Sequence, residues 1–179
     1  MPRPKLIILN GFAGVGKTTL AKRYIDEHPL ALDIEGDRLI VMLGQWLAHE
    51  DEARKIIFEL TKSLAGTHLG LGRDVVITYL LTDATHAEAF EQLAQEHSAD
   101  YKEVFLAADR DEAIARLLKR GTWGEEGLDP LTEEDLPSIN KLWDTMATET
   151  AKRPSSITVP VKEGDIDHTY QLFITALEG

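Results

Sequence analysis

Short apolar runs alternate with segments of helical character along the whole chain. The apolar runs cover residues 6–9, 30–34, 75–80, 101–107 and 157–161, and each has the length of a buried strand. The segments between them that we predict to be helices are 20–25, 37–47, 51–64, 84–97, 110–120, 132–152 and 166–177. This alternation predicts an α/β fold, with a mostly parallel sheet of about five strands and helices on both faces.

No linker, repeat or low-complexity tract interrupts this pattern, and 179 residues are typical of one domain, which we place at residues 1–179. The apolar share of 43% is enough for one sizeable core. The chain has no cysteine, which excludes a disulfide framework and a thiolate metal site. It also shows no signal peptide and no stretch of bilayer-spanning length, so we expect a cytoplasmic protein without a membrane partner.

The charge balance limits the partners. Asp and Glu number 31 against 19 Lys and Arg, which gives a formal net charge of −12. Such an acidic surface repels polyanions unless a local basic patch overrides it, so long nucleic acid is a poor default partner. The six histidines show no ligand spacing, so a zinc site is not expected. We expect a monomer or homodimer whose partners are small molecules.

One motif lies between the first apolar run and the first helix. Residues 11–18 match G-x-x-x-x-G-K-[ST] at every fixed position, which is a Walker A phosphate loop. Glycines let the loop take unusual backbone angles and bring its N–H groups close to phosphate oxygens, at the positive end of the helix that follows. We therefore expect ATP to be bound by Gly11, Ala13, Gly14, Val15, Gly16, Lys17, Thr18 and Thr19.

Two side chains of the loop carry separate chemical roles. Lys17 brings a mobile positive charge to the β- and γ-phosphates, and the Thr18 hydroxyl is placed to ligate Mg²⁺. The motif predicts a nucleotide site with ATP and Mg²⁺ as cofactors. It does not predict what happens to the phosphate, and it does not distinguish ATP from GTP.

The order of elements resembles that of the small P-loop kinases of metabolites and antibiotics. The early phosphate loop, a short second strand ending in acidic residues and an arginine-rich helix followed by a loop are similar to gluconate kinase, shikimate kinase and chloramphenicol phosphotransferase. The resemblance implies a three-layer P-loop NTPase fold, with a small lid at about 121–131 and acceptor-side helices at about 37–69. It also implies transfer of the γ-phosphate of ATP to a hydroxyl of a metabolite, nucleoside, nucleotide or antibiotic.

In those kinases the acidic residues after the second strand face the acceptor hydroxyl. Here Glu35-Gly36-Asp37 resembles the D-G-D pattern of gluconate kinases, and Asp37 is the candidate base that accepts the hydroxyl proton. Arg38 is the candidate for binding an anionic group of the acceptor or the transferring phosphate. The alternative is that Asp37 only caps the helix that follows, and Asp33 or Glu35 is then the candidate base.

Most such kinases also end the third strand with an acidic residue that holds magnesium through water. In this chain the first carboxylate after that strand is Asp83, which we expect to cap the next helix. The magnesium shell would then depend on Thr18, water, phosphates and one of Asp33, Glu35 or Asp37.

The helix at 110–120 carries Arg116 and Arg120 four residues apart, on one face. The resemblance implies that these arginines reach the nucleotide, with Arg120 stabilising charge during transfer and Arg116 binding the nucleotide. Alternatively Arg116 belongs to a solvated face and pairs with Glu112. Residues 121–130 contain no arginine, which moves the expected role of a lid arginine onto Arg120.

Two other functions fit the motif. A nucleotide switch or ATPase without an acceptor would keep the phosphate loop and need no base. A polynucleotide-end kinase would need a basic groove, and this acidic composition supplies little for one.

Overall fold

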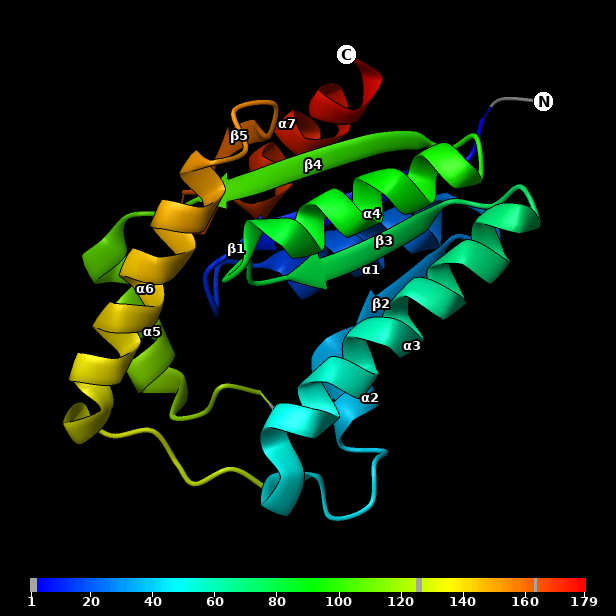
Figure 1. Ribbon diagram of the computed structural model, residues 1–179. Coiled ribbons are helices and arrows are strands. Elements are labelled where there is room, and N and C mark those ends of the chain that lie inside the picture. The colour runs from blue at the N-terminus through cyan, green and yellow to red at the C-terminus, as the bar shows by residue number, and fades with distance from the viewer. Residues whose placement is uncertain (1–2, 125–126, 163) are drawn as a thin grey trace.

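The computed structural model of the chain describes residues 3–124, 127–162 and 164–179. Within this part of the chain, five strands form one all-parallel sheet in the order β2-β3-β1-β4-β5 (Figure 1). The strands are β1 (Lys5–Gly11), β2 (Leu32–Glu35), β3 (Val75–Tyr79), β4 (Asp100–Ala107) and β5 (Ile157–Pro160). The predicted α/β class, with a mostly parallel sheet of about five strands, is confirmed.

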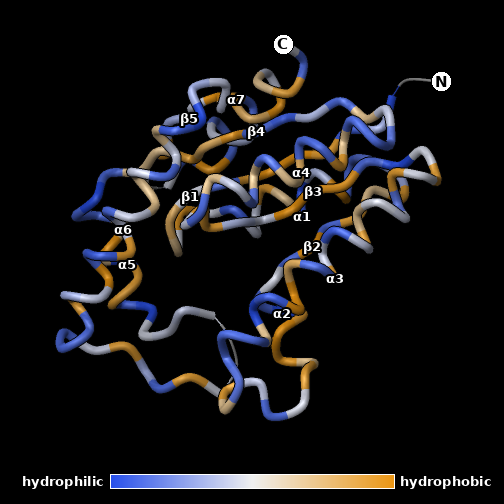
Figure 2. Tube along the Cα trace, in the orientation of Figure 1, coloured by the Kyte–Doolittle hydropathy of each residue, from blue (hydrophilic) through white to orange (hydrophobic). Residues whose placement is uncertain are grey.

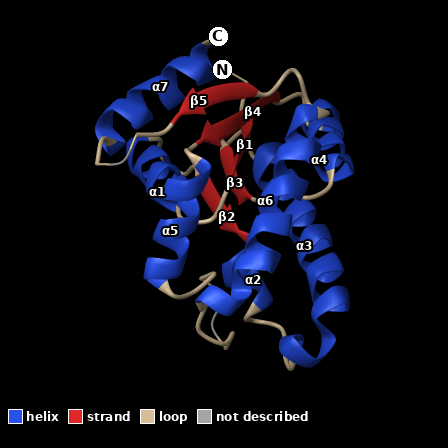
Figure 3. Ribbon diagram, turned by 90° about the vertical axis from the view of Figure 1, so that its left-hand side faces the viewer, coloured by secondary structure: helices blue, strands red, loops and turns tan. Residues whose placement is uncertain are grey.

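Helices cover both faces of the sheet, as the turned view in Figure 3 shows. On one face α1, α5, α6 and α7 share a core with the sheet, and on the other face α3 and α4 do. The helices are α1 (Lys17–Glu27), α2 (Gly36–Ile40), α3 (Glu50–Gly70), α4 (Ala84–Glu96), α5 (Arg110–Arg120), α6 (Leu136–Ala151) and α7 (Ile166–Glu178), with short 3₁₀ turns η1 (Trp46–His49) and η2 (Glu133–Asp135).

The central strand β1 divides its side chains between the two cores. Leu6 and Ile8 belong to the core under α3 and α4, whereas Ile7 and Leu9 belong to the core under α1 and α7. None of the four is more than 1% exposed. Because successive side chains of a strand point to opposite faces, a strand covered on both sides needs an unbroken apolar run, which is the pattern at 6–9.

The predicted helix at 37–47 is wrong. The structure has a helix of five residues, α2, followed by turns and then η1. Residues 41–45 separate the two, and Gln45 adopts a left-handed conformation with φ of 56°. A right-handed helix cannot pass through a residue in that conformation. The segment therefore forms two short helical elements, α2 and η1, in place of one helix.

The helix predicted at 51–64 is longer in the structure, where α3 spans Glu50–Gly70. α3 continues to Gly70, and at Gly66 it packs closely against the end of α4. A Cβ atom built at Gly66 would lie 3.0 Å from Nε2 of His97. Gly66 therefore serves as a point of close approach between two helices.

The start of the second strand also differs from the prediction. Leu30 takes a left-handed conformation with φ of 65° and is 68% exposed, so β2 begins two residues later, at Leu32. The apolar run at 30–34 therefore contains a turn residue that periodicity alone does not reveal.

Hydropathy follows the layers of the fold. In Figure 2 hydrophobic and hydrophilic positions alternate along α3 and α4, as expected for helices with one face on the sheet. Within the residues that the structure describes, no helix combines the length and the apolar character needed to cross a membrane.

Candidate active site

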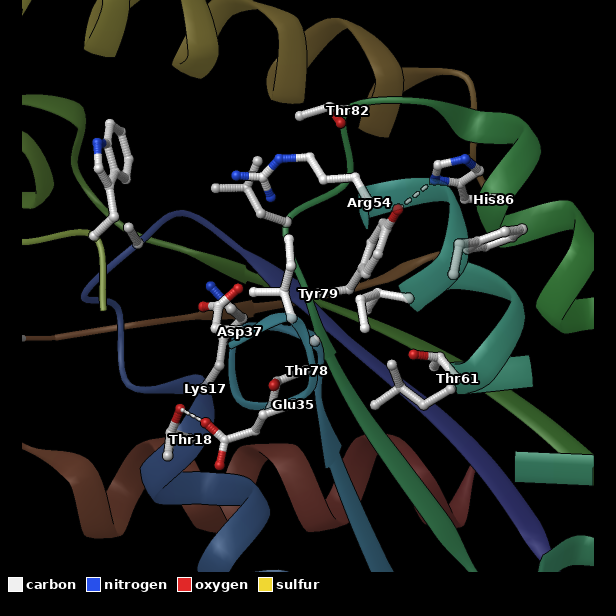
Figure 4. A pocket seen from close by; sticks show the side chains of 18 of the residues that line it. Lys17, Thr18, Glu35, Asp37, Arg54, Thr61, Thr78, Tyr79, Thr82 and His86 are labelled. Carbon is white, nitrogen blue, oxygen red and sulfur yellow. Dashed lines mark hydrogen bonds between the residues drawn. The ribbon is translucent and has the colours of Figure 1, made fainter. Parts of the chain in front are cut away.

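A cavity of about 790 Å³ opens at the carboxyl ends of β1, β2 and β3. Its wall is built from the phosphate loop, the start of α2, one face of α3, the end of β3, the start of α4 and the segment after α5 (Figure 4). Ligands of open parallel sheets bind outside the carboxyl ends of the strands, so this cavity lies where a nucleotide and an acceptor would meet.

The phosphate loop connects the buried end of β1 to α1. A Cβ atom at Gly11 would lie 3.1 Å from the carbonyl oxygen of Leu106, so this position needs glycine for close packing. Gly16, with φ of 104°, caps α1 in a left-handed conformation. Within the loop, Gly11 and Val15 are buried and do not line the cavity. The residues that line it are Ala13, Gly14, Gly16, Lys17, Thr18 and Thr19.

Lys17 is folded back onto its own loop. Its Nζ donates hydrogen bonds to the carbonyl oxygens of Gly11, at 2.7 Å, and Phe12, at 2.9 Å. Desolvation lowers the pKa of Lys17 to about 8, against the opposing attraction of Asp37. Figure 4 shows the ends of the Lys17 and Asp37 side chains beside one another. A phosphate group in the loop would offer Lys17 a stronger partner than these carbonyls.

Asp37 lies in the first turn of α2 and lines the cavity. The N-cap residue of α2 is Glu35, and no side-chain hydrogen bond caps the helix there. Asp37 is thus not the N-cap residue that the alternative interpretation required. Desolvation raises the pKa of Asp37, while the positive charges of Lys17, Arg54 and Arg120 act in the opposite direction. The structure therefore places a carboxylate of raised proton affinity next to the phosphate loop.

Glu35, the last residue of β2, contacts the phosphate loop through its side chain. Its Oε2 accepts a hydrogen bond of 3.0 Å from the Thr18 hydroxyl, and its side chain is only 12% exposed. Its Oε1 lies 2.9 Å from Nη2 of Arg38. Arg38 itself is 68% exposed at the side chain and is not among the residues that line the cavity. Its proposed contact with the acceptor thus stays a prediction without support from this geometry.

The oxygen atoms of Thr18 and Glu35 are suited to Mg²⁺, which prefers oxygen ligands and usually retains several waters. Across the described residues, no group of three or more His, Asp or Glu side chains is arranged to hold a metal ion. A magnesium ion here would therefore depend on Thr18, on nucleotide phosphates and on water held by Glu35, which also lines the cavity.

Asp83, the first acid after β3, does not contribute to this cavity wall. Its carboxylate accepts hydrogen bonds from the backbone N of Thr85, at 2.9 Å, and from the Thr85 hydroxyl, at 2.7 Å. Asp83 is the N-cap residue of α4, as predicted.

Asp33 is a third acidic side chain of the β2 segment, but it lies outside the cavity wall. Burial, together with the negative charge of Glu35, raises the pKa of Asp33 to about 6. Its Oδ1 is buried and has no hydrogen-bond partner among the described residues. Asp33 is thus less well placed than Asp37 to meet an acceptor.

We expect Asp33→Asn to stabilise the protein at neutral pH. The pKa of about 6 in the folded chain exceeds the value of about 3.9 expected when unfolded. The folded state therefore binds the proton more tightly, and stability is lost as pH rises from about 4 to 6. Because Asn cannot ionise, the free energy of unfolding of Asp33→Asn should exceed that of the wild type by about 1–3 kcal/mol at pH 7 and by almost nothing near pH 4.

Urea unfolding in metal-free buffer across this pH range measures the effect. Asp26→Asn, at an exposed position of α1, is the matched control and should change the stability by less than about 0.5 kcal/mol. A variant at Asp33 that is less stable than the wild type at pH 7 would show that the carboxylate is ionised and well solvated.

The two arginines of α5 are placed differently. Arg120 lines the cavity and donates hydrogen bonds to the carbonyl oxygens of Thr122, at 2.8 Å, and Trp123, at 2.7 Å. Arg116 does not line the cavity, and its buried Nε has no hydrogen-bond partner in the described part of the chain. Of the two, only Arg120 therefore stands at the wall of the cavity, while the role of Arg116 toward the nucleotide stays a prediction.

The segment after α5 bridges two sides of the cavity. Its base is closed by a hydrogen bond of 2.8 Å from the backbone N of Leu131 to the carbonyl oxygen of Gly121. Trp123 packs edge-on against Phe12 of the phosphate loop, and Leu128 packs with the cluster of residues around α2 and η1. In Figure 1 this segment runs across to the start of α3. Residues 125–126 of the predicted lid lie outside the described residues.

The part of the cavity farthest from the phosphate loop contains residues that we did not identify from the sequence. Arg54, Phe58 and Thr61 line it from α3, and Tyr79 and His86 line it from β3 and α4. The three residues of α3 follow helical spacing, so they share one face of the helix. That periodicity identifies a buried face, but it does not distinguish a face that lines a cavity from one that packs in a core.

A Walker A loop at the end of the central strand of a parallel β2-β3-β1-β4-β5 sheet defines a P-loop NTPase. Residues 6–135 match the family AAA_33, described as an AAA domain, and this match covers most of the 179 residues. The chain belongs to this family, and the predicted resemblance to the small P-loop kinases holds for the fold, which solved structures of such kinases share. A comparison with curated proteins gives no match.

Solved structures share the fold at low sequence identity. The APS kinase CysC of Mycobacterium tuberculosis, in complex with AMPPNP and APS, matches over 100% of both chains, with a TM-score of 0.63 and 19% identity. A gluconokinase of Sinorhizobium meliloti matches over 99% of this chain and 94% of its own, with a TM-score of 0.65 and 16% identity. A chain of the Pnkp1/Rnl/Hen1 RNA repair complex matches 85% of this chain but only 47% of its own length, with a TM-score of 0.65 and 18% identity.

Proposed function

We propose that this protein is an ATP-dependent phosphotransferase that moves the γ-phosphate of ATP to a hydroxyl of a small molecule. The observation that carries the proposal is the placement of Lys17 and Asp37 beside one another in a single cavity, which extends from the phosphate loop to α3 and α4. An ATPase without an acceptor could use a carboxylate at that position to orient water, but it would not need a cavity reaching beyond the phosphate site.

In the proposed reaction, the acceptor oxygen forms a bond to the γ-phosphorus as the bond from that phosphorus to the β–γ bridging oxygen breaks. The bonding electrons leave with ADP, and the hydroxyl proton passes to the Asp37 carboxylate. The raised pKa of Asp37 makes it a stronger proton acceptor. Lys17 and Arg120, which also face the cavity, stabilise the charge on the transferring group.

Mg²⁺ bound beside Thr18 and Glu35 would neutralise charge on the β- and γ-phosphate oxygens. The contribution of the chain is to hold the two oxygen-bearing side chains together, through their hydrogen bond of 3.0 Å, at the mouth of the phosphate loop.

An acceptor screen that follows ADP release from ATP and Mg²⁺ tests the function. We expect at least one hydroxyl compound to raise ADP release above the rate without acceptor, and to gain a phosphoryl group detectable by mass spectrometry. The panel should hold sugars, sugar acids, nucleosides, aromatic alcohols and a short oligonucleotide with a free 5′ hydroxyl. Slow ADP release that no compound changes would favour a nucleotide switch, and selective labelling of the oligonucleotide would favour a polynucleotide-end kinase.

A further inference from the structure

Asn10 is a buried polar side chain near the end of β1, where the phosphate loop begins. It is 0% exposed and directly precedes Gly11, the first residue of the loop. Its Oδ1 accepts a hydrogen bond of 2.9 Å from the backbone N of Leu81, and its Nδ2 donates one of 3.1 Å to Oγ1 of Thr150. A backbone N can only donate, so the bond to Leu81 fixes which way the amide points. The oxygen and the nitrogen of this amide thus have partners on two different segments.

The hydrogen bond to Leu81 extends the contact between β1 and β3 beyond the end of the sheet. The parallel register of the two strands ends at Asn10, opposite the last residue of β3. Leu81 is 1% exposed, so its backbone N would be buried without a partner if Asn10 offered no acceptor. Leu80 and Thr82, on either side of it, line the cavity, and Figure 4 shows Thr82 beyond the end of β3. We call residues 80–82 the wall segment.

The end of α6 holds the connection from β3 to α4 at two points. Thr150, in the last turn of α6, acts through Asn10, which carries the wall segment. The neighbouring Glu149 acts directly, because its Oε2 accepts a hydrogen bond of 3.0 Å from the backbone N of Ala84 at the start of α4. The wall segment is therefore held between the end of β1 and the end of α6.

α6 also contacts the phosphate loop at a separate place. The ring of Trp143 packs against the ring of Phe12, with centroids 4.8 Å apart, and Phe12 is 1% exposed. This contact does not involve the hydroxyl of Thr150. Loss of that hydroxyl should therefore loosen the wall segment without displacing the phosphate loop.

We propose that Asn10 is a positioning residue of phosphoryl transfer, which holds the wall segment at a fixed place relative to the phosphate loop. This inference rests on the proposed function, because it concerns where the acceptor stands in the same cavity. Transfer needs the acceptor oxygen in line with the γ-phosphorus and about 3–3.5 Å from it, and small displacements slow the reaction strongly. The backbone of Asn10 leads into the loop and its side chain holds the wall segment, so one residue relates the positions of the two substrates. Water in place of the acceptor would not depend on that wall.

Thr150→Val tests this role, because it removes the hydroxyl that holds the Asn10 amide and keeps the shape of the side chain. We expect hydrogen exchange at the amide of Leu81, followed by NMR, to become at least about fivefold faster. With the compound that the acceptor screen identifies, kcat for transfer should fall at least about tenfold. ADP release without acceptor and the affinity for AMPPNP with Mg²⁺ should stay within about twofold. A merely structural role would not change the ratio of transfer to hydrolysis.

Thr150→Ser keeps the hydroxyl and should behave as the wild type in all four measurements. Thr148→Val is the matched control on the same helix, because its exposed hydroxyl bonds only to the carbonyl oxygen of Asp144, at 2.8 Å. Asn10→Ala removes both hydrogen bonds of the amide and should change exchange and transfer in the same direction and further. Adding Thr150→Val to Asn10→Ala should change nothing more, because Thr150 acts through Asn10. If Asn10→Ala does not fold, the Val and Ser variants of Thr150 decide.

The outcomes separate this inference from the function on which it depends. Faster exchange in Thr150→Val with an unchanged ratio of transfer to hydrolysis would show a structural role only and overturn the proposal. An equal fall of transfer and hydrolysis would show that the phosphate loop itself has moved, and would overturn it as well. In both cases the phosphotransferase activity stands. If no compound in the screen becomes phosphorylated, the proposed function fails, and the positioning role fails with it.

Discussion

Lys17→Ala should reduce phosphoryl transfer by about three orders of magnitude or more while leaving the fold intact. Lys17 stands in the phosphate loop with its Nζ on the carbonyl oxygens of Gly11 and Phe12, from which it would turn to the transferring phosphate. The substitution loses those two hydrogen bonds but also removes a desolvated charge, whose pKa is lowered to about 8. The free energy of unfolding should therefore change by no more than about 1 kcal/mol.

Steady-state ADP release with the best acceptor and urea unfolding of the same preparation measure the two effects. Lys22→Ala is the matched control, because Lys22 lies on the exposed side of the same helix. Its kinetics and stability should match those of the wild type. Full activity in Lys17→Ala would show that the loop does not hold the reacting phosphate, and the phosphotransferase proposal would then fail.

Asp37→Asn should separate nucleotide binding from chemistry. Asn keeps the shape of the side chain and its ability to accept a hydrogen bond, but it cannot take the proton of the acceptor hydroxyl. We expect kcat to fall by a factor of about 10² to 10⁴, as is typical of a lost general base. The affinity for nucleotide should be unchanged or slightly higher, because the substitution removes a negative charge near Lys17.

Single-turnover transfer and equilibrium titration with a nonhydrolysable ATP analogue measure these two quantities. Asp83→Asn is the matched control, because Asp83 caps α4 outside the cavity and Asn is an equally good N-cap residue. If Asp37→Asn transfers phosphate at the wild-type rate, the base is another residue. Glu35 then becomes the next candidate, because it lines the cavity and Asp33 does not.

The features that follow local rules could be predicted from the sequence. A strand covered on both faces needs a continuous apolar run, and residues 6–9 supply one for β1. The phosphate loop is specified by fixed residue types, because its backbone must pack under Leu106 at Gly11 and turn left-handed at Gly16. Asp83 before a helical segment predicts an N-cap residue, and the structure confirms it. In each case the physical cause lies within a few residues of the signal.

The features that the sequence did not predict depend on contacts between distant segments. Gly66 lies inside α3, where a larger side chain would crowd His97 at the end of α4. The segment 37–47 is divided by turns at 41–45, and the left-handed conformation of Gln45 has no distinctive signal in the sequence. Arg38 was expected in the site because of its place beside Asp37 in the sequence. Adjacent residues at the start of a helix point in different directions, and Arg38 instead pairs with Glu35.

The small cluster formed by Ile40, Trp46, Ala53 and Ile57 lies apart from the two cores that hold the sheet together. The elements that form this cluster follow β2, an edge strand, whereas the phosphate loop follows the central strand β1. Substitutions in this cluster can thus reshape the acceptor side while the nucleotide side keeps its framework. The shape of the acceptor side could therefore be changed by substitution without any change in the phosphate loop.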